Sequence, residues 1–214
     1  MNEDSPDYKI DEGMINFPSH IPSSINGYVL KIKTVDYYLQ HINLEFIDKK
    51  FVNSTKNTLL LKQHLAGRYA VEKLITNFKK KPSILMKRDL LDAPLLYVNS
   101  KQWGLSISHT QDLAITTINF QNKYLGIDVE KNNPLSEKFE KILPDDNLIK
   151  RTLIERWVVY ESIGKACKLG LRFNKKQIKW RGDDILLNME KDEIKLKLYL
   201  WHQHNHVFSL VWEK

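Results

Sequence analysis

The segment from Trp157 to Ala166 is typical of a helix, and it constrains the fold of this chain more than any other feature. Trp157, Glu161 and Lys165 are four residues apart, so they project from one face of that helix. An aromatic ring, a carboxylate and an ammonium therefore share one face. An exposed ion pair between Glu161 and Lys165 is the simplest interpretation, and a functional site is the alternative.

The segment 126–130, Gly-Ile-Asp-Val-Glu, ends 27 residues before this helix begins and is typical of the end of a strand. Side chains two residues apart share a strand face, so Asp128 and Glu130 point the same way. They could be ordinary solvated carboxylates at a strand end. If the strand and the helix pack together, however, they converge with Glu161 and Lys165. Three carboxylates with room left for water and phosphate are typical of a magnesium site, so Asp128, Glu130 and Glu161 are the candidate metal ligands.

A third segment, 105–110, has the sequence Leu-Ser-Ile-Ser-His-Thr. With it, the chain resembles the Sfp-type 4′-phosphopantetheinyl transferase family in three blocks. Segment 105–110 is similar to the Ser-His block of that family, and segment 126–130 to its Gly-Ile-Asp-x-Glu. Segment 157–170 is similar to its helix Trp-x-x-Lys-Glu-Ser-x-x-Lys-Ala with a trailing glycine. The blocks occur in the order of the family and span about a third of the chain.

The resemblance implies a magnesium-dependent enzyme of the holo-[acyl-carrier-protein] synthase type. Such an enzyme moves the phosphopantetheine arm of coenzyme A to a serine of an acyl, polyketide or peptidyl carrier protein and releases 3′,5′-ADP. Glu161, Lys165 and Asp128 would be its catalytic residues. Glu161 would ligate the metal and take the proton of the carrier serine. Lys165 would stabilise charge that develops on the phosphate.

The resemblance also implies contacts to coenzyme A on both sides of the site. Ser108 and His109 would contact the phosphorylated ribose, and a basic helix in the first half would supply further contacts. The implied coenzyme A contacts are Ser108, His109, Lys165, Lys62, His64 and Arg68. A turn without a ligand role is the alternative for the Ser-His pair, and a solvated helix face is the alternative for the other basic residues.

Two residues depart from the family pattern. Tyr160 stands where a lysine usually precedes the catalytic glutamate, and Ala93 stands where many members have the lysine of Gly-Lys-Pro. Both departures remove a positive charge that would face phosphate. The alternative function is therefore a non-catalytic protein of the same fold that binds coenzyme A or a carrier protein.

The family likeness further implies an α+β fold, a pseudo-dimer of two similar halves that each pack a long helix on a small antiparallel sheet. We expect residues 1–122 to form the N-terminal half with coenzyme A contacts. Residues 123–214 would form the C-terminal half with the metal-binding and catalytic residues. The site of such a protein lies at the seam between the halves.

Local patterns predict the individual elements. Alternating apolar residues predict a strand over 28–35, and helical spacing predicts a helix from Asn53 or Ser54 to Phe78, closed by the basic residues 79–81. Strands over 113–120 and 124–130 are expected to form a hairpin. A second long helix over 148–168 would end at Gly170. The remaining strands are predicted at 97–100, 104–108, 178–180, 185–187, 194–201 and 207–212.

Composition limits the partners and the compartment. The chain has 33 Lys and Arg against 26 Asp and Glu, a formal net charge of +7, which favours polyanions such as coenzyme A or acidic carrier proteins. A basic nucleic-acid-binding protein is the weaker alternative, because no known nucleic-acid-binding signature occurs. The single cysteine, Cys167, excludes an internal disulfide. The polar amino terminus and the absence of an apolar run near ~20 residues predict a cytoplasmic protein without a membrane partner. With the family resemblance, we expect a monomer.

Overall fold

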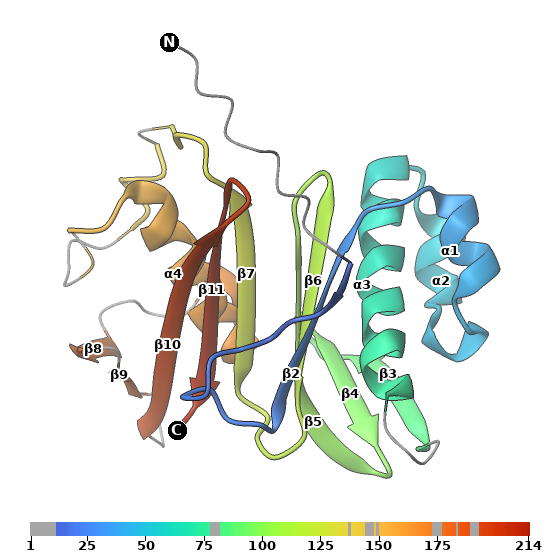
Figure 1. Cartoon of the computed structure of the whole chain (residues 1–214), viewed down its shortest axis with the longest axis horizontal. Helices are drawn as coiled ribbons and strands as arrows, with labels where there is room; N and C mark the ends of the chain where they lie inside the picture. Colours follow the sequence, from blue (N-terminus) through green and yellow to red (C-terminus); the bar gives the residue numbers. More distant parts are fainter. Residues whose placement is uncertain are drawn as a thin grey trace.

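The computed structural model describes residues 12–77, 82–136, 138–143, 148, 150–172, 177–182, 184–188 and 193–214. The helices are α1 (Val35–His41), α2 (Lys49–Ser54), α3 (Thr58–Thr76) and α4 (Leu153–Ala166), with 3₁₀ turns at Leu44–Phe46 and Gly170–Arg172. The strands are β1 (Gly13–Met14), β2 (Ile25–Lys31), β3 (Ile84–Arg88), β4 (Pro94–Val98), β5 (Lys101–His109), β6 (Leu113–Asn119), β7 (Leu125–Lys131), β8 (Ile178–Arg181), β9 (Asp184–Asn188), β10 (Glu193–Gln203) and β11 (His206–Glu213). Two antiparallel sheets with helices packed against them make this an α+β fold (Figure 1).

Two halves of roughly similar topology are visible in the described residues. The first sheet has the strand order β1-β2-β6-β5-β4-β3, and the second has the order β7-β11-β10-β9-β8. Leaving aside the two-residue β1 and the short helices α1 and α2, each half runs from a strand, β2 or β7, to its longest helix, α3 or α4, and returns through antiparallel strands. In each half the last of these strands pairs with the first. Helices α1 to α3 lie together at one end of the molecule, and α4 accompanies the second sheet at the other (Figure 1).

The first long helix begins later than the sequence predicts. The expected cap, Asn53 or Ser54, lies in the separate short helix α2. The side chain of Asn57 caps α3 instead, because its Oδ1 accepts a hydrogen bond from the backbone N–H of Leu60 at 3.1 Å. The first strand is also shifted, since β2 ends at Lys31 and the rest of the predicted strand leads into α1. Phe78 and the basic residues 79–81 lie outside the described residues.

The second long helix is shorter than predicted at both ends. Thr152 and Glu155 form a capping box, in which the threonine side chain accepts from the Glu155 N–H and the glutamate accepts from the Thr152 N–H. This reciprocal pair starts α4 at Leu153, five residues after the predicted start. At the other end α4 stops at Ala166, before the expected Gly170. Lys168, with φ of +60°, is the first left-handed residue after the helix, and Gly170 is left-handed as well.

Helix α4 packs very closely on the second sheet. A Cβ atom at Gly126 of β7 would lie 1.9 Å from the carbonyl oxygen of Ser162, so only glycine permits this approach. The Ser162 hydroxyl is fully buried and lies within hydrogen-bond distance of two carbonyl oxygens, that of Val158 at 2.8 Å and that of Ser209 at 2.9 Å. Backbone contact at this crossing fixes the height of α4 above β7, and with it the position of every side chain that α4 presents to that strand.

Strands β6 and β7 do not form the predicted hairpin, because they belong to different sheets. Strand β6 is already paired with β2 on one side and β5 on the other, while β7 pairs with β11. The open edge of β7 instead meets serine side chains of β5. The backbone N–H of Ile127 donates to Ser106 Oγ at 2.9 Å, and that of Val129 donates to Ser108 Oγ at 3.4 Å.

An apolar core lies beneath this seam and joins the two sheets. It contains buried residues of both β6 and β7, together with Phe208 and Leu210 of β11. Ile21 and Ile25, in and just after the segment that precedes β2, are part of the same core, and that segment crosses between the sheets in Figure 1. In the described part of the chain, no helix combines the length and the apolar character needed to cross a bilayer.

Candidate functional site

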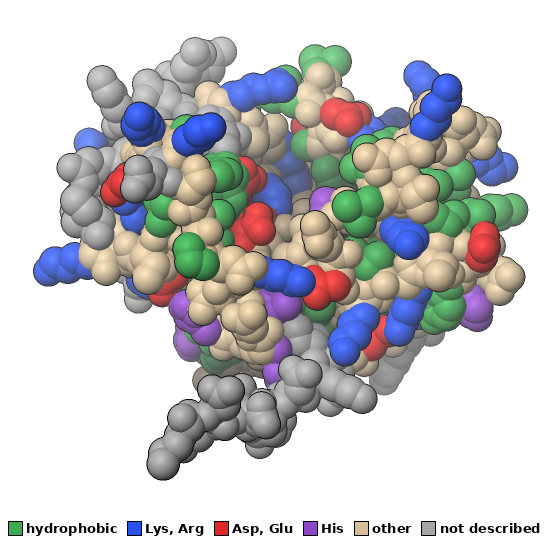
Figure 2. Space-filling model, turned by 90° about the horizontal axis from the view of Figure 1, so that it is seen from above, with side chains coloured by type: hydrophobic (Ala, Val, Ile, Leu, Met, Phe, Trp, Pro, Cys, Tyr) green, Lys and Arg blue, Asp and Glu red, His purple; other side chains and the backbone are tan. Residues whose placement is uncertain are grey.

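A cleft of about 600 Å³, called here the central cleft, opens between the two halves. Its walls come from the β3–β4 turn, the middle of β5, and α4 with the residues that follow it. Figure 2 shows basic, acidic and histidine side chains around a hollow near the middle of one face of the molecule. The charged residues of the cleft wall are Asp92, Glu161, Lys165, Lys168 and Arg172. Basic groups therefore outnumber acidic groups in this wall.

Three residues from three different elements bond to one another beside the cleft. Lys165 Nζ on α4 lies 2.5 Å from Asp128 Oδ1 on β7 and 2.9 Å from Ser108 Oγ on β5. The Ser108 hydroxyl donates to the same Asp128 Oδ1 at 2.7 Å. Asp128 is only 3% exposed, and its second oxygen, Oδ2, is buried without a hydrogen-bond partner among the described residues. The carboxylate is thus neutralised on one oxygen and open on the other.

Glu130 and Glu161 complete an acidic group around Lys165. Burial, followed by repulsion from Asp128, raises the pKa of Glu130 to about 7, although Lys165 and a hydrogen bond with Trp157 oppose the rise. Burial also raises the pKa of Glu161, an effect that Lys165 opposes and Asp128 reinforces. The four charged side chains therefore lie within electrostatic reach of one another, as the helix and strand spacing predicts. One lysine does not fully offset three carboxylates.

The donor set suits magnesium in kind, but the ligands are not arranged around a ready-made site. Carboxylate oxygens are the ligands that Mg²⁺ prefers, and the unpartnered Asp128 Oδ2 could accept a cation. Among the described residues, no group of three or more His, Cys, Asp or Glu side chains is placed to hold a metal ion. Lys165 already neutralises the other Asp128 oxygen. A cation held by Asp128, Glu130 and Glu161 therefore requires Lys165 to release Asp128.

His109 ends β5 at the rim of this group and is exposed. The surrounding protein and the positive charge of Lys165 lower its pKa, although Asp128 opposes the shift. A neutral imidazole at this position can accept or donate a hydrogen bond and can gain charge when an anion arrives. Ser108 thus bonds to Lys165, and His109 lies within electrostatic reach of the same ammonium.

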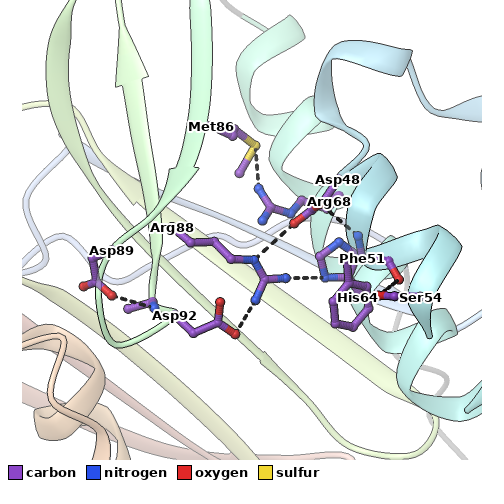
Figure 3. Close-up of polar contacts among 10 residues, drawn as sticks. Asp48, Phe51, Ser54, His64, Arg68, Met86, Arg88, Asp89 and Asp92 are labelled. Atoms are coloured by element: carbon purple, nitrogen blue, oxygen red, sulfur yellow. Dashed lines mark hydrogen bonds and ion pairs between the residues drawn. The ribbon is translucent and has the colours of Figure 1, made fainter.

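A second basic group, the arginine cluster, lies around Arg88 of β3. Arg88 Nε is 3.2 Å from Asp48 Oδ2, and its Nη1 is 2.6 Å from Asp92 Oδ2. Its Nη2 is 3.5 Å from His64 Nδ1, and the guanidinium lies 5.1 Å from the ring centre of Phe51 (Figure 3). The His64 ring stacks on the same phenyl ring at 4.1 Å. Burial and two neighbouring arginines lower the pKa of His64 to about 4.

Arg68 of α3 is the most buried cation of the arginine cluster. It is 5% exposed, and its Nη1 donates to the sulfur of Met86 at 3.1 Å (Figure 3). Burial and the nearby Arg88 lower the pKa of Arg68 to about 10. Together with Lys87 and Lys49 it lines a second cavity of about 390 Å³. A buried guanidinium whose hydrogen-bond partner is a thioether has donors left for an anion.

The predicted coenzyme A contacts thus fall into two groups. Ser108, His109 and Lys165 lie beside the central cleft, while His64 and Arg68 belong to the arginine cluster. The groups adjoin, because the charge of His109 contributes to the lowered pKa of His64. Lys62 lies on α3, partly exposed, and among the described residues belongs to neither group.

The two departures from the family pattern occupy different environments. Tyr160 is fully buried in the core of the second half, edge-on to Trp180 at 6.4 Å, so it does not face the cleft. Ala93 lies in the cleft wall, where its N–H donates to Asp89 Oδ1 at 2.8 Å. Lys168 and Arg172 also line the cleft, although no motif assigned them. The sequence signal for these two residues was their spacing, because Lys168 lies three residues after Lys165 and Arg172 lies four residues after Lys168.

No model of a known protein family matches the chain, and no curated protein matches it. The side chains that converge at the seam, and the motifs that supply them, are therefore the features of this chain that bear on its function.

Proposed function

We propose that this chain is a 4′-phosphopantetheinyl transferase of the Sfp type, which moves the phosphopantetheine arm of coenzyme A to a serine of a carrier protein. The observation that supports the proposal most is the meeting of three sequence blocks at one point. Ser108 from β5, Asp128 from β7 and Lys165 from α4 bond to one another across the seam between the halves. Each block alone is common, but their convergence on one acidic and basic group suits phosphate chemistry.

The distribution of positive charge supports coenzyme A as the ligand. Coenzyme A carries a pyrophosphate and a separate ribose phosphate, so its site needs basic groups in two places. The central cleft offers three basic residues, and the arginine cluster offers Arg68 and Arg88. Asp92 connects the two regions, since it lines the cleft and pairs with Arg88 at 2.6 Å. Adjoining basic regions suit a ligand with two separated anionic groups.

Glu161 is the residue we assign as general base. Its pKa is raised by burial, and a carboxylate becomes a better base as its pKa approaches the working pH. It would accept the proton of the carrier serine while the serine oxygen bonds to the β-phosphorus. The bond from that phosphorus to the bridging oxygen breaks, and 3′,5′-ADP leaves. Lys165, which lines the same cleft, would donate to the phosphate oxygens on which charge develops.

Asp128, Glu130 and Glu161 would hold magnesium in the working enzyme. Bound there, the ion would neutralise pyrophosphate oxygens and help to align them for attack. Its charge would also relieve the repulsion from Asp128, which adds to the effect of burial in raising the pKa of Glu130 to about 7. Lys165 would then be free to leave Asp128 and turn to the phosphate.

The finer architecture belongs to the same proposal. We assign residues 1–122 and 123–214 as the two halves of a pseudo-dimer, each with a long helix on an antiparallel sheet. The chain passes from the first sheet to the second between Asn119 and Leu125, which supports a boundary there. The partners would be coenzyme A and an apo carrier protein, whose acidic surface would suit the net charge of +7. We propose a cytoplasmic monomer that works without a membrane.

Three observations favour a second candidate, a protein of this fold that binds coenzyme A without transferring its arm. Asp128 Oδ1 is already neutralised by Lys165, and the described residues offer no ready three-ligand metal group. Neither Tyr160 nor Ala93 brings a positive charge to the cleft. Such a protein would bind coenzyme A and leave it unchanged.

Substitution of Glu161 by glutamine separates the two candidates. The matched control is Glu193→Gln, because Glu193 is an exposed carboxylate at the start of β10. Release of 3′,5′-ADP from coenzyme A should require an apo carrier protein and magnesium. It should fall by at least about 100-fold in Glu161→Gln and stay unchanged in the control. Coenzyme A binding with no 3′,5′-ADP release by the wild-type protein would favour the second candidate.

A further inference from the structure

Lys168 occupies a backbone position that favours glycine. It follows α4 with φ of +60°, in the left-handed region. Its N–H donates to the carbonyl oxygen of Lys165 at 3.1 Å, and the N–H of Leu169 donates to that of Gly164 at 2.9 Å. This is the Schellman pattern that ends many helices, usually with glycine at the left-handed position. A side chain there costs free energy, so the chain retains lysine against the local backbone preference.

The side chain of Lys168 faces the central cleft, whose wall it shares with Lys165 and Arg172. Its ammonium donates a hydrogen bond to the carbonyl oxygen of Leu105 on β5. No carboxylate of the described residues lies within ion-pair distance of this ammonium. Burial lowers the pKa of Lys168 to about 8, and the charge of Asp89 offsets this only in part.

The Lys168 ammonium is partly buried, and its hydrogen-bond partner is an uncharged carbonyl group. It has three donors and loses hydration on burial, which disfavours the charged form unless a counter-charge is near. Lys165 has such a counter-charge in Asp128, whereas Lys168 has none at ion-pair distance among the described residues. An anion that enters the cleft would supply it, and the cleft already carries more basic than acidic residues.

We propose that Lys168 is a specificity-determining residue of the central cleft, which binds an oxygen of the coenzyme A pyrophosphate beside Lys165. The assignment rests on the function proposed above. It accounts for the two departures from the family pattern, because Tyr160 is buried and Ala93 is uncharged, so neither brings a cation to the cleft. In this chain the missing charge comes from the C-terminal end of α4.

A purely structural role for Lys168 makes a different prediction. Its hydrogen bond to Leu105 links the second half to the first, so removing a mere tether should lower stability and leave ligand binding unchanged. If Lys168 is instead a strained cation without a carboxylate partner, its removal should raise stability and weaken ligand binding. Glycine is favoured at φ of +60°, so Lys168→Gly should fold and unfold at a higher temperature than the wild type.

The test is titration calorimetry of the full chain with coenzyme A, dephospho-coenzyme A and inorganic pyrophosphate, together with thermal unfolding. The variants are Lys168→Gly and the charge-retaining Lys168→Arg. Lys101→Met is the control, because Lys101 is exposed at the start of β5 and outside the cleft wall. Loss of a charge-assisted hydrogen bond should weaken binding in Lys168→Gly by about 10- to 100-fold. Lys168→Arg and the control should stay near the wild type.

Comparison of coenzyme A with dephospho-coenzyme A shows which phosphate Lys168 binds. An equal loss for coenzyme A and dephospho-coenzyme A supports the pyrophosphate, because dephospho-coenzyme A lacks the ribose phosphate. A loss for coenzyme A alone would overturn that assignment. Unchanged binding in Lys168→Gly, or equal weakening in Lys168→Arg, would overturn the role of Lys168.

The failure of this inference and the failure of the proposed function give different results. If the wild type binds coenzyme A and Lys168→Gly binds it equally well, only the role of Lys168 is wrong. If the wild type binds neither form of coenzyme A, the proposed function and the named ligand are both wrong. Titration with pyrophosphate then tests the anion site by itself. Loss of pyrophosphate binding in Lys168→Gly supports that site, and unchanged pyrophosphate binding overturns it.

Discussion

Substitution of Gly126 by alanine should damage both the fold and the site, because this glycine sets the distance between β7 and α4. A Cβ atom there would lie 1.9 Å from the carbonyl oxygen of Ser162 and 2.8 Å from the backbone nitrogen of Ala166. An ordinary van der Waals contact begins near 3.4 Å, so α4 must move away by about 1.5 Å. Both clashing groups are backbone, and no side-chain rotation relieves them.

The expected cost follows from that displacement. Overpacking of this kind typically costs about 1–3 kcal/mol, and we expect the upper end because the helix must move as a unit. A shift of ~1 Å in a catalytic group can cost about 100-fold in rate. Glu161 and Lys165 would both move relative to Asp128, so the transfer rate should fall by at least that factor.

The assay is urea unfolding of Gly126→Ala combined with carrier-protein modification by the same preparation. Gly13→Ala is the control, because a Cβ atom at Gly13 meets no other atom within 4 Å. The control should change neither quantity. If Gly126→Ala unfolded at the wild-type urea concentration and modified a carrier at the wild-type rate, the argument that this contact positions the site would be refuted.

Three further substitutions test other parts of the account. Thr152→Ala removes the capping box of α4 and should lower the free energy of unfolding by about 1 kcal/mol, measured by urea unfolding. Lys165→Met leaves Asp128 charged and buried without its ion-pair partner, so stability at pH 7 should fall by about 3 kcal/mol and transfer should be abolished; wild-type stability would contradict the pairing. His64 has its pKa lowered to about 4 in the folded protein, so the unfolded chain binds its proton first as pH falls. The contribution of neutral His64 to stability is therefore present above pH ~6.5 and lost towards pH 4, and His64→Gln should flatten the pH profile of unfolding in that window.

Local spacing predicted which side chains of α4 and β7 lie near one another. Positions four apart on a helix and two apart on a strand share a face, and the structure places Glu161 and Lys165 of α4 beside Asp128 and Glu130 of β7. These relations depend on helical and strand periodicity and on the packing of one helix on one strand. Both are short-range properties that a sequence displays directly.

Relations that depend on the whole fold were not visible in the sequence. Strands β6 and β7 follow each other closely and alternate well, yet their partners are β2, β5 and β11, which lie far away in the chain. The limits of α3 and α4 depend on side-chain caps, Asn57 and Thr152, that compete with other polar residues nearby. Hydrophobic periodicity does not show which of several neighbouring polar residues caps a helix.

The electrostatic state of the site could not be predicted from the sequence either. The sequence suggested three carboxylates around a metal, whereas the structure shows one of them, Asp128, bonded to Lys165 and Ser108. The sequence did not single out Lys168, because its left-handed backbone and the cleft that it lines with β5 are properties of the folded chain.

The proposed transfer of a phosphopantetheine arm can be measured by intact mass spectrometry of apo carrier proteins. Acyl, polyketide and peptidyl carriers would each be incubated with the wild-type protein, coenzyme A and magnesium. We expect at least one carrier to gain the mass of one phosphopantetheine arm, and we expect EDTA or the Glu161→Gln substitution to prevent the gain. An unchanged mass for every carrier, from a protein that calorimetry shows to bind coenzyme A, would contradict the proposed transfer.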